Sequence, residues 1–556
     1  MKRYVIGVDF GSDSARALIV DALSGEQVAE AVAGYPRWLQ GLYQDAEKHM
    51  FRQHPLDYLE ALTSCVREAL ERAGDRIRDG IAALSVDTTG STPCPVDKNG
   101  VPLALLQEFC DEPDAMFHLW KDHTAIREAA EITEAFRNNP DGIDYTCHQG
   151  PYASEWFWAK ILHTTRLNAD IRRAAWSWVE HSDWIPALLV GNTQPESMYR
   201  CACAAGHKAY WHSDWGGLPS EDCLDVLDSC LVQVRRTYGR GPLPSTHRLG
   251  TITPEWAERL SLPKDTLVGG SSFDAHAGAV GAGVNERTLV LNLGTSAVDM
   301  FVAPAEKFAG KDISWLGGAA ENSIIPGLTG LESGQSAFGD AYAWFRGILM
   351  WPLRELLANS KVLIDARRQQ TLTEEIEDGI YAALQRQAET IAPEDAPAAL
   401  DWFNGRRYPH VNEEVRSALA GLNMGTSAPA IYRALVTATA LGQKRILETL
   451  EAEGIRVEDI VAVGGIAQKS PFLMQTLSDA LNKPVSVSRT RQACALGAAM
   501  YAAVAAGLHP TLEQAQRAMC EGVLRVYEPR ADAIERYAVV YRRYLRLADF
   551  MDEARF

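Results

Sequence analysis

The fold of this chain is decided near its amino terminus, by the stretch Val5-Ile6-Gly7-Val8-Asp9-Phe10-Gly11-Ser12-Asp13-Ser14-Ala15-Arg16-Ala17-Leu18-Ile19-Val20-Asp21. Two β-branched runs predict two strands, and Gly11 permits the tight turn between them. Successive N–H groups in such a turn can form an anion-binding nest, and Asp9 at the strand end would face an accompanying cation. No helix follows, which separates the stretch from the P-loop and Rossmann fingerprints. An ordinary hairpin with a polar turn is the alternative.

A second copy of this design lies about half a chain away, from Thr288 to Val302, with Gly294-Thr295-Ser296 at its turn. Duplication of a hairpin with an anion-binding turn favours two related domains. The length of 556 residues also predicts more than one domain, and two large ones is the simplest count.

Composition narrows the class of protein. Hydrophobic residues make up 47% and charged residues 23%, as in water-soluble globular proteins. The net charge of −18 argues against a nucleic-acid partner. The first residues show no signal peptide. The longest apolar run, Ala493 to Leu508, is too short for a membrane helix and predicts a packed helix.

The cysteines favour a reducing compartment. Ten scattered cysteines without a secretion signal predict reduced thiols in a cytoplasmic protein. Cys201 and Cys203 form the only close pair, and without two further ligands nearby they are not expected to bind a metal.

Three places in the first half carry candidate chemistry. A buried strand, Ile81–Asp87, leads into the loop Thr88–Pro93, and strand-end loops of α/β sheets bind ligands. Lys208 lies among apolar and aromatic neighbours, although a solvated surface lysine is the default interpretation. Asp274 follows a predicted strand, Leu267–Val268, and a Gly-Gly-Ser-Ser loop at the start of a small-residue helix, where it is either an N-cap or a base.

The segment from about 105 to 220 reads as an elaboration rich in tryptophan. Most of these rings are expected in a core, while one or two could stack on a sugar. Eight of the fourteen tryptophans fall there: Trp120, Trp156, Trp158, Trp176, Trp178, Trp184, Trp211 and Trp215.

The second half offers three further features. Leu331–Asp340 is expected to be a helix entry, and Asp401–Arg407 a polar-aromatic loop. Ile460–Val463 predicts a strand that ends in the pair Gly464-Gly465, which lets the backbone approach a flat ligand or a phosphate. The alanine-rich helix from Ala493 is expected to pack behind that strand.

Together these features resemble the FGGY carbohydrate kinases of the actin-like ATPase superfold, over nearly the whole chain from Tyr4 to about Leu547. Leu119–His123 and Ala205–Lys208 resemble in particular the members of that family that phosphorylate L-ribulose. The segments that carry the resemblance are Asp9–Ser14, Val86–Pro93, Leu119–His123, Ser154–Lys160, Ala205–Lys208, Phe273–His276, Glu332–Ser336 and Asp401–Gly405.

The resemblance implies an α/β fold with two actin-like (ribonuclease H-like) domains around a central nucleotide/sugar cleft. Residues 1–285 would be the sugar-binding domain, with the insertion at about 105–220, and residues 286–556 the nucleotide-binding domain. The implied reaction is ATP-dependent phosphorylation of L-ribulose to L-ribulose 5-phosphate in arabinose breakdown, with ATP and Mg²⁺ and without nucleic acid or membrane. A homodimer is one expectation for its assembly.

The resemblance also assigns residues. Asp274 would be the general base, and Asp9 would bind the metal directly or through water. The implied substrate pocket comprises Gly90, Trp120, Lys208, Asp274 and Glu332. The implied nucleotide-binding residues are Gly11, Ser12, Asp13, Ser14, Arg16, Gly294, Thr295, Gln335, Asn404, Gly464 and Gly465.

Three alternatives remain at this point. A kinase for another ketose or polyol, such as xylulose or glycerol, is the closest. An actin-like chaperone or polymer would need neither the tryptophan-rich segment nor an equivalent of Asp274. A sugar-responsive repressor would carry a helix-turn-helix before the first strand, and the strand begins at Tyr4.

Overall fold

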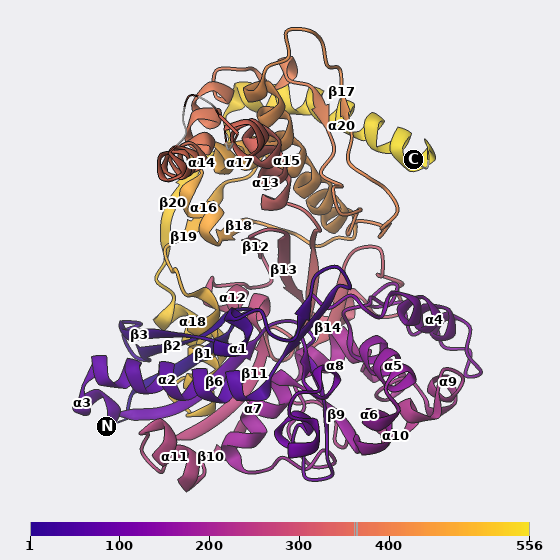
Figure 1. Ribbon diagram of the computed structural model, residues 1–556, viewed down its shortest axis with the longest axis vertical. Coiled ribbons are helices and arrows are strands. Elements are labelled where there is room, and N and C mark those ends of the chain that lie inside the picture. The colour runs from indigo at the N-terminus through magenta and orange to yellow at the C-terminus, as the bar shows by residue number, and fades with distance from the viewer. Residues whose placement is uncertain (1, 358, 361, 363–364, 555–556) are drawn as a thin grey trace. The chain divides into compact units, whose positions relative to one another are not determined.

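The computed structural model describes residues 2–357, 359–360, 362 and 365–554, which form two compact units (Figure 1). Unit 1 comprises Met1–Glu286, Met300–Glu332 and Gln492–Gly522, and unit 2 comprises Arg287–Asp299, Ser333–Arg491 and Val523–Phe556. Each unit carries helices and strands, which confirms the predicted α/β class. The units are discontinuous in sequence, and the predicted division into domains at residues 285 and 286 stays a prediction.

Unit 1 is built on a six-stranded sheet that contains the first predicted hairpin. Its strands run in the order β10-β11-β6-β1-β2-β3. The neighbours β11, β6 and β1 are parallel, while the other pairs are antiparallel. The bounds are β1 Tyr4–Phe10, β2 Ser14–Asp21, β3 Gln27–Gly34, β6 Ile81–Thr88, β10 Arg248–Thr251 and β11 Leu267–Phe273.

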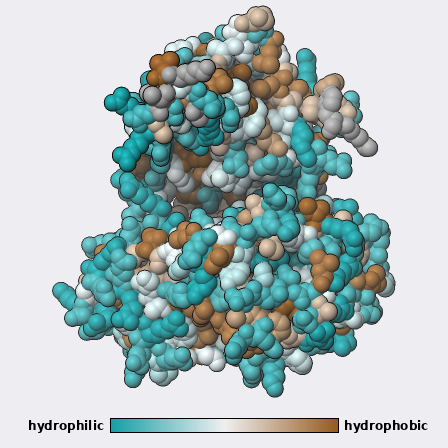
Figure 2. Space-filling model, in the orientation of Figure 1, coloured by the Kyte–Doolittle hydropathy of each residue, from teal (hydrophilic) through white to brown (hydrophobic). Residues whose placement is uncertain are grey.

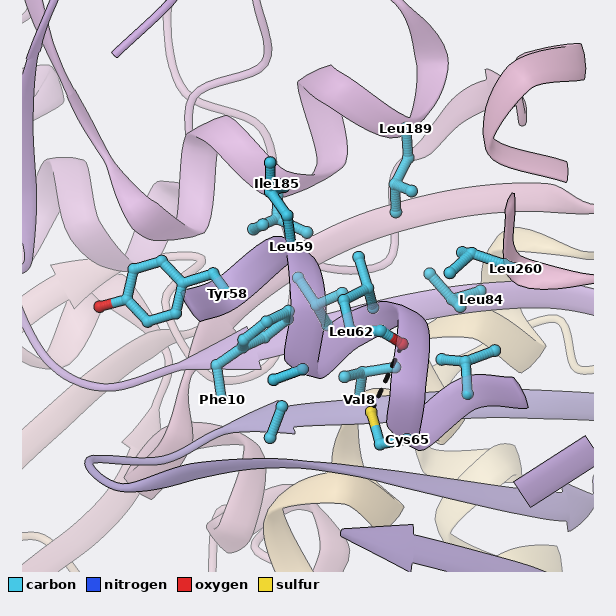
Figure 3. Packing of buried hydrophobic residues seen from close by; sticks show 14 of the residues in the cluster. Val8, Phe10, Tyr58, Leu59, Leu62, Cys65, Leu84, Ile185, Leu189 and Leu260 are labelled. Carbon is cyan, nitrogen blue, oxygen red and sulfur yellow. Dashed lines mark hydrogen bonds between the residues drawn. The ribbon is translucent and has the colours of Figure 1, made fainter. Parts of the chain in front are cut away.

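One face of this sheet is covered by α2 (Pro55–Ala73), which the apolar stripe from Leu56 to Arg72 predicts. Figure 3 shows Tyr58, Leu59, Leu62 and Cys65 of this helix packed with Val8 and Phe10 of β1. The cluster also takes in side chains of α7 (His181–Val190) and α11 (Pro254–Leu260), so apolar burial joins elements far apart in sequence.

Two helices of small residues, α12 (Asp274–Gly281) and α18 (Ala493–Ala505), also lie against this sheet and each other. They approach very closely: a Cβ on Gly497 would lie 1.9 Å from the Ala277 carbonyl oxygen, and one on Gly7 only 1.8 Å from the Ala495 carbonyl oxygen. The expectation that the helix from Ala493 packs behind the strand at 460–463 is therefore wrong, because α18 packs on β1 and β6 of unit 1.

The predicted elaboration forms a second core within unit 1. Trp156, Trp158 and Trp178 are buried in this core, with Trp211 and Trp215 partly buried against it, and Trp184 is buried in the cluster around α2. Trp120 and Trp176 are 40% and 42% exposed. Most of the tryptophans are therefore core residues, as expected. Its elements are β7 Pro93–Val96, β8 Phe117–His118, α4 Ile126–Arg137, α5 Phe157–Leu167, α6 Ala169–Ala174, β9 Ser177–Glu180, α8 Ala202–Ala209, α9 Glu221–Asp225 and α10 Ser229–Thr237.

In unit 2 the second predicted hairpin is present as β12 and β13. Strand β12 lies beside β18, β18 beside β19, and β20 pairs antiparallel with β19. Strands β13 and β15 follow β12 in the sheet and contain residues of both units, and β14 (Gly318–Glu321) pairs with the first residues of β15. The bounds are β12 Thr288–Leu293, β13 Ala297–Ala303, β15 Thr329–Gln335, β18 Asp459–Val463, β19 Val485–Ser488 and β20 Val523–Tyr527.

The expected helix entry at Leu331–Asp340 is mostly strand. Strand β15 continues to Gln335, and helix α13 (Gly339–Pro352) begins only at Gly339. The remaining long helices of unit 2 are α14 Ala366–Ala388, α15 Ala428–Ala452, α17 Pro471–Leu481 and α20 Ala531–Ala554. The last of these confirms the predicted amphipathic helix over Ile534–Ala548.

The described helices include none that is both long enough and apolar enough to span a membrane. On the face shown in Figure 2, most of the exposed residues are hydrophilic and the apolar ones are scattered.

The close approach of α18 to α12 gives a test of the packing. Gly497→Ala places a methyl group on a backbone carbonyl that cannot rotate away, so we expect a loss of at least about 1–3 kcal/mol of unfolding free energy. Gly379→Ala in α14 is the control, because nothing lies within 4 Å of its added Cβ, and a helical alanine should stabilise by up to about 1 kcal/mol. Chemical denaturation measures both, and equal stability of the two variants would contradict the packing described here.

Candidate functional site

Three carboxylates lie at the carboxyl ends of three neighbouring parallel strands in unit 1. Asp9 is the second-last residue of β1 and lies opposite Asp87, the second-last residue of β6. Asp274 directly follows β11, whose Phe273 is opposite Thr88. Asp9 and Asp87 are buried, and Asp274 is partly exposed. Asp87 was not among the predicted site residues. Its signal was present in the sequence, since it also ends a predicted buried strand in front of a polar loop.

Burial, together with neighbouring charges, changes the acidity of the three carboxyl groups. Burial, with the charge of Asp9 second, raises the pKa of Asp274 to about 7. Burial and the negative charges of Asp9 and Asp274 raise the pKa of Asp87 far above that of a free aspartate. Burial also raises the pKa of Asp9, although Arg16 opposes this shift by donating from Nη1 to Asp9 Oδ2 over 3.2 Å. A cation or a shared proton would relieve this crowding.

The approach to Asp274 differs from the prediction. Gly269 to Ser272 belong to β11 and are buried, so no flexible loop precedes the carboxylate. The helix α12 has Phe273 at its N-cap and Asp274 as its first residue. Asp274 Oδ1 accepts a hydrogen bond from the Ala275 amide at 2.6 Å, which fixes the side chain while leaving Oδ2 available for a second partner.

Lys208 is buried, so the surface interpretation is wrong. It lies in the last turn of α8 and is only 6% exposed. Its ammonium group is 3.3 Å from Glu332 Oε2 and 4.9 Å from the centre of the Trp156 ring. Lys208 Nζ is also 5.9 Å from the centre of the ring of Phe273, the residue before Asp274, so the pair lies near that carboxylate. The charge of Glu332 contributes to the raised pKa of Asp274. Three predicted sugar residues thus lie in one region of unit 1.

The other two predicted sugar residues are also neighbours. A Cβ on Gly90 would be 3.6 Å from Cβ of Trp120, and the Trp120 indole donates to the Ser12 hydroxyl over 2.9 Å. Lys160 ties together the segments that carry Gly90 and Trp120. Its buried ammonium group donates to the carbonyl oxygens of Ser91, His118 and Leu119 at 2.9–3.1 Å.

The first hairpin turn is fixed by hydrogen bonds that its carbonyl groups accept. Tyr35 Oη donates to the Gly11 carbonyl, Gln53 Nε2 to that of Ser12, and the Tyr35 amide to that of Asp13. Within the described residues, the amides of Ser12 and Asp13 donate to no acceptor. A turn whose carbonyls are anchored and whose amides are available fits the predicted anion nest.

The nucleotide-side glycines of unit 2 meet at the start of α13. A Cβ on Gly464 would lie 2.5 Å from the Leu293 carbonyl oxygen, and one on Gly339 would lie 2.6 Å from that of Gly294. The Phe338 and Asp340 amides both donate to the Thr295 carbonyl. The second hairpin turn, Gly464 and the N-terminus of α13 therefore lie together, and helix N-termini commonly bind anions. The role of these residues in nucleotide binding stays a prediction. Gly465 begins α16 (Gly465–Lys469) and has open space around it.

Gln335 and Asn404 differ in their accessibility. The Gln335 amide nitrogen donates to Asp401 and Thr439, and its oxygen accepts from Gln443, so the side chain is fully engaged inside unit 2. Asn404 is exposed, on the loop whose Gly405 carbonyl accepts from Ser336. Both stay predictions as nucleotide contacts.

Metal-ligand geometry occurs in three clusters among the described residues. These are Asp9 with Asp87 and Cys494, His207 with His276 and Glu332, and His148 with His212 and Asp214. Neither Cys201 nor Cys203 belongs to any of them. A separate cavity of about 310 Å³, lined by Met198, Arg240 and His247 among others, contains none of the predicted site residues.

The crowding of carboxylates predicts a stability cost. Because the pKa of Asp87 is raised in the folded protein, this group favours folding less as the pH rises above its unfolded pKa of about 4. In EDTA at pH 8.5, we expect Asp87→Asn to raise Tm by at least about 2–4 °C, and by less at pH 6.

Glu71→Gln is the matched control, since Glu71 is an exposed carboxylate on α2 and should leave Tm nearly unchanged at both pH values. A lower Tm for Asp87→Asn at pH 8.5 would show that the ionised carboxylate stabilises the fold.

The known proteins that are similar to this chain are carbohydrate kinases. Residues 289–506 match the C-terminal domain of the FGGY family of carbohydrate kinases. A ribulokinase of Vibrio parahaemolyticus is 41% identical over 554 residues, 99% of this chain and 96% of that one, and a ribulokinase of Halalkalibacterium halodurans is 32% identical over 99% of this chain and 95% of that one.

Among solved structures, a xylulose kinase from Rhodospirillum rubrum superimposes with a TM-score of 0.77 at 19% identity over the whole of both chains. A glycerol kinase from Plasmodium falciparum with ADP gives 0.72 at 15% identity over 98% of each chain. These two show the shared fold, and the full-length sequence matches show the family. The chain belongs to the ribulokinases, within the FGGY family of carbohydrate kinases.

Proposed function

We propose that the protein transfers a phosphoryl group from ATP to the terminal hydroxyl of L-ribulose and so forms L-ribulose 5-phosphate. Membership of a kinase family implies the use of ATP, and the full-length ribulokinase relatives favour L-ribulose as the acceptor. The observation that carries the proposal is the arrangement of Asp274, a carboxyl group with a pKa near 7, close to the buried Lys208–Glu332 pair.

Asp274 would act as the general base. Phosphoryl transfer depends mainly on positioning and on charge stabilisation, and the acceptor hydroxyl loses its proton as it attacks. A base works best when its pKa lies near the working pH, because it is then largely ionised and still basic. Asp274 meets this condition, and the hydrogen bond from the Ala275 amide holds its carboxylate in one orientation.

The sugar would be held by groups of complementary charge. The ammonium group of Lys208 can donate to a sugar oxygen, while Glu332 can accept from a hydroxyl. Trp120, 40% exposed beside Gly90, offers an aromatic face for the C–H groups of the sugar. Such a site combines a few directional polar contacts with an apolar wall.

Each hairpin turn, taken by itself, offers groups that could bind a phosphate of the nucleotide. In unit 1 the amides of Ser12 and Asp13 are available, and Arg16 is three residues after Asp13. In unit 2 the turn at Gly294 and Thr295 lies beside Gly464 and the start of α13. Backbone amides and helix N-termini bind phosphate oxygens without bringing a counter-charge of their own.

Asp9 and Asp87 fit a divalent cation such as Mg²⁺. Both oxygens of buried Asp87 are without a hydrogen-bond partner within the described residues, and they lie against Asp9. Carboxylate oxygens are hard ligands that suit Mg²⁺, which usually keeps several of its waters. When bound there, the ion would neutralise negative charge on the phosphates, and the two carboxylates would hold it directly or through water.

The setting of the reaction follows from the same relatives. We propose that the protein serves arabinose breakdown in the cytoplasm and that its partners are the sugar and ATP, not nucleic acid. A homodimer is the assembly we propose to test, by light scattering.

A substrate panel tests the function directly. In an assay that couples ADP release to NADH oxidation, L-ribulose should give the highest kcat/KM among ketopentoses and polyols, including xylulose and glycerol. A higher kcat/KM for xylulose would replace L-ribulose as the substrate, and no ADP release with any sugar would contradict the kinase itself.

The role of Asp274 is tested by Asp274→Asn. The amide keeps the shape of the side chain but cannot take a proton, so kcat should fall roughly 10²–10⁴-fold with both substrates still bound. Steady-state kinetics, with binding and Tm measured in parallel, checks this. If Tm collapsed while kcat per folded molecule persisted, Asp274 would only anchor the helix.

The second hairpin turn is tested by Gly294→Val. A Cβ at Gly294 would be 3.7 Å from the nearest atom, the Ser296 carbonyl oxygen, so the fold should tolerate it. The added methyl groups would crowd a phosphate at the turn, and we expect ATP affinity by calorimetry to fall at least tenfold, roughly 1.4 kcal/mol. Gly347→Val in α13, also in open space, should bind ATP normally. Unchanged affinity in Gly294→Val would remove this turn from the phosphate site.

A further inference from the structure

Two histidines outside the predicted site lie beside the Lys208–Glu332 pair. His276 is the third residue of α12, two residues after Asp274, and His207 directly precedes Lys208 on α8. Their exposed fractions are 1% and 0%, and their ring centres are 4.9 Å apart. His276 Nε2 is 3.9 Å from Glu332 Oε2, which is too long for a hydrogen bond.

Three of the four ring nitrogens have no hydrogen-bond partner within the described residues. They are both nitrogens of His276 and Nε2 of His207, while His207 Nδ1 faces Gln149 Oε1 at 3.3 Å. Buried polar atoms without partners are rare, since each costs about 1–3 kcal/mol. A group of them at one place calls for a ligand that supplies several donors and acceptors.

The ionisation of the rings limits the kind of ligand. Burial lowers the pKa of His276 to about 4 and that of His207 far below the usual value, so both rings are neutral near pH 7. A neutral imidazole has one donor and one acceptor nitrogen. A hydroxyl group both donates and accepts, and neighbouring hydroxyls along a sugar chain could satisfy both kinds of nitrogen.

A transition metal is the competing ligand, because the donor atoms of His207, His276 and Glu332 lie within 4.8 Å of one another. The surroundings oppose it. The Lys208 ammonium group lies 3.3 Å from Glu332 Oε2, so the only carboxylate of the cluster already faces a cation, and that cation would repel a metal ion.

We propose that His276, with His207 behind it, hydrogen-bonds hydroxyl groups of the acceptor sugar and helps to select it, a role that rests on the sugar-kinase function proposed above. Lys208 and Glu332 then supply charged contacts, and the two imidazoles supply neutral ones. The neutral contacts favour an acceptor with hydroxyls at the right carbons and discriminate against one lacking a hydroxyl there, because the rings would again be left unpartnered.

The test compares His276→Leu with His276→Gln in the full-length protein. Leucine removes both ring nitrogens, so KM for L-ribulose and its Kd by calorimetry without ATP should rise at least tenfold, with KM for ATP unchanged. Glutamine restores one donor and one acceptor and should recover part of the affinity. Tm should hold or rise in His276→Leu, since an unpartnered polar ring is replaced by an apolar side chain.

His181→Leu is the matched control. His181 is equally buried and has no hydrogen-bond partner for either ring nitrogen within the described residues, but its ring stacks on Tyr58 in the apolar core. It should leave KM for the sugar unchanged, so an effect confined to His276 is specific to that place.

Two results would overturn the proposal. One is an unchanged sugar KM and Kd in His276→Leu. The other is stoichiometric Zn²⁺ or Co²⁺ binding to the wild type that His276→Leu and His207→Leu abolish, which would make the cluster a metal site. The wild-type panel separates these from failure of the function itself: if another ketose is the better substrate, the same variants are compared on that ketose, and if no sugar binds, both proposals fall.

Discussion

Unit 1 has to accommodate three closely spaced carboxylates at one edge of its main sheet. Because β11, β6 and β1 are parallel neighbours, their carboxyl ends lie side by side, and Asp9, Asp87 and Asp274 are therefore close together. Burial raises the pKa of each, and for Asp87 and Asp274 the negative charges nearby raise it further, because like charges repel strongly in surroundings of low dielectric. A fold that keeps such a cluster gives up stability for it, and perturbed carboxyl groups of this kind are concentrated at functional sites.

The dry surroundings of the cluster are produced by close packing of small residues. Gly7 lets α18 lie directly on β1, and Gly281 and Gly497 let α12 and α18 lie directly on each other, with backbone atoms where side chains would otherwise stand. This removes water from around Asp9 and Asp87 and fixes the start of α12, where Asp274 stands. The same contacts that stabilise unit 1 therefore adjust the acidity of the proposed base.

The buried ionisable side chains around Glu332 and the Gly90 loop are compensated in different ways. The Lys208–Glu332 pair has its charges matched, so burying it leaves no lone ion. His207 and His276 are buried without charge and keep unpartnered nitrogens. Behind the Gly90 loop, Lys160 has all its protons donated to backbone carbonyls and acts as a support. These three sets of buried ionisable side chains differ in their surroundings, and we assign them different roles for that reason.

The local features could be predicted from the sequence: both hairpins, the α2 stripe, the strand at Ile81–Asp87, the Gly464–Gly465 pair and the candidate residues Asp274 and Lys208. Each is visible in a short window because periodicity, glycines and strand-end carboxylates act over a few residues. Four outcomes needed the tertiary structure: the strand character of Gly269–Ser272, β15 continuing to Gln335, α18 packing on β1, and Asp87 and His276 as neighbours of the predicted residues. The pattern of a short segment predicts that a side chain is buried, but it does not predict which residues the side chain packs against. Those residues can lie hundreds of positions away in the chain: α18, which begins at position 493, covers a strand that begins at position 4.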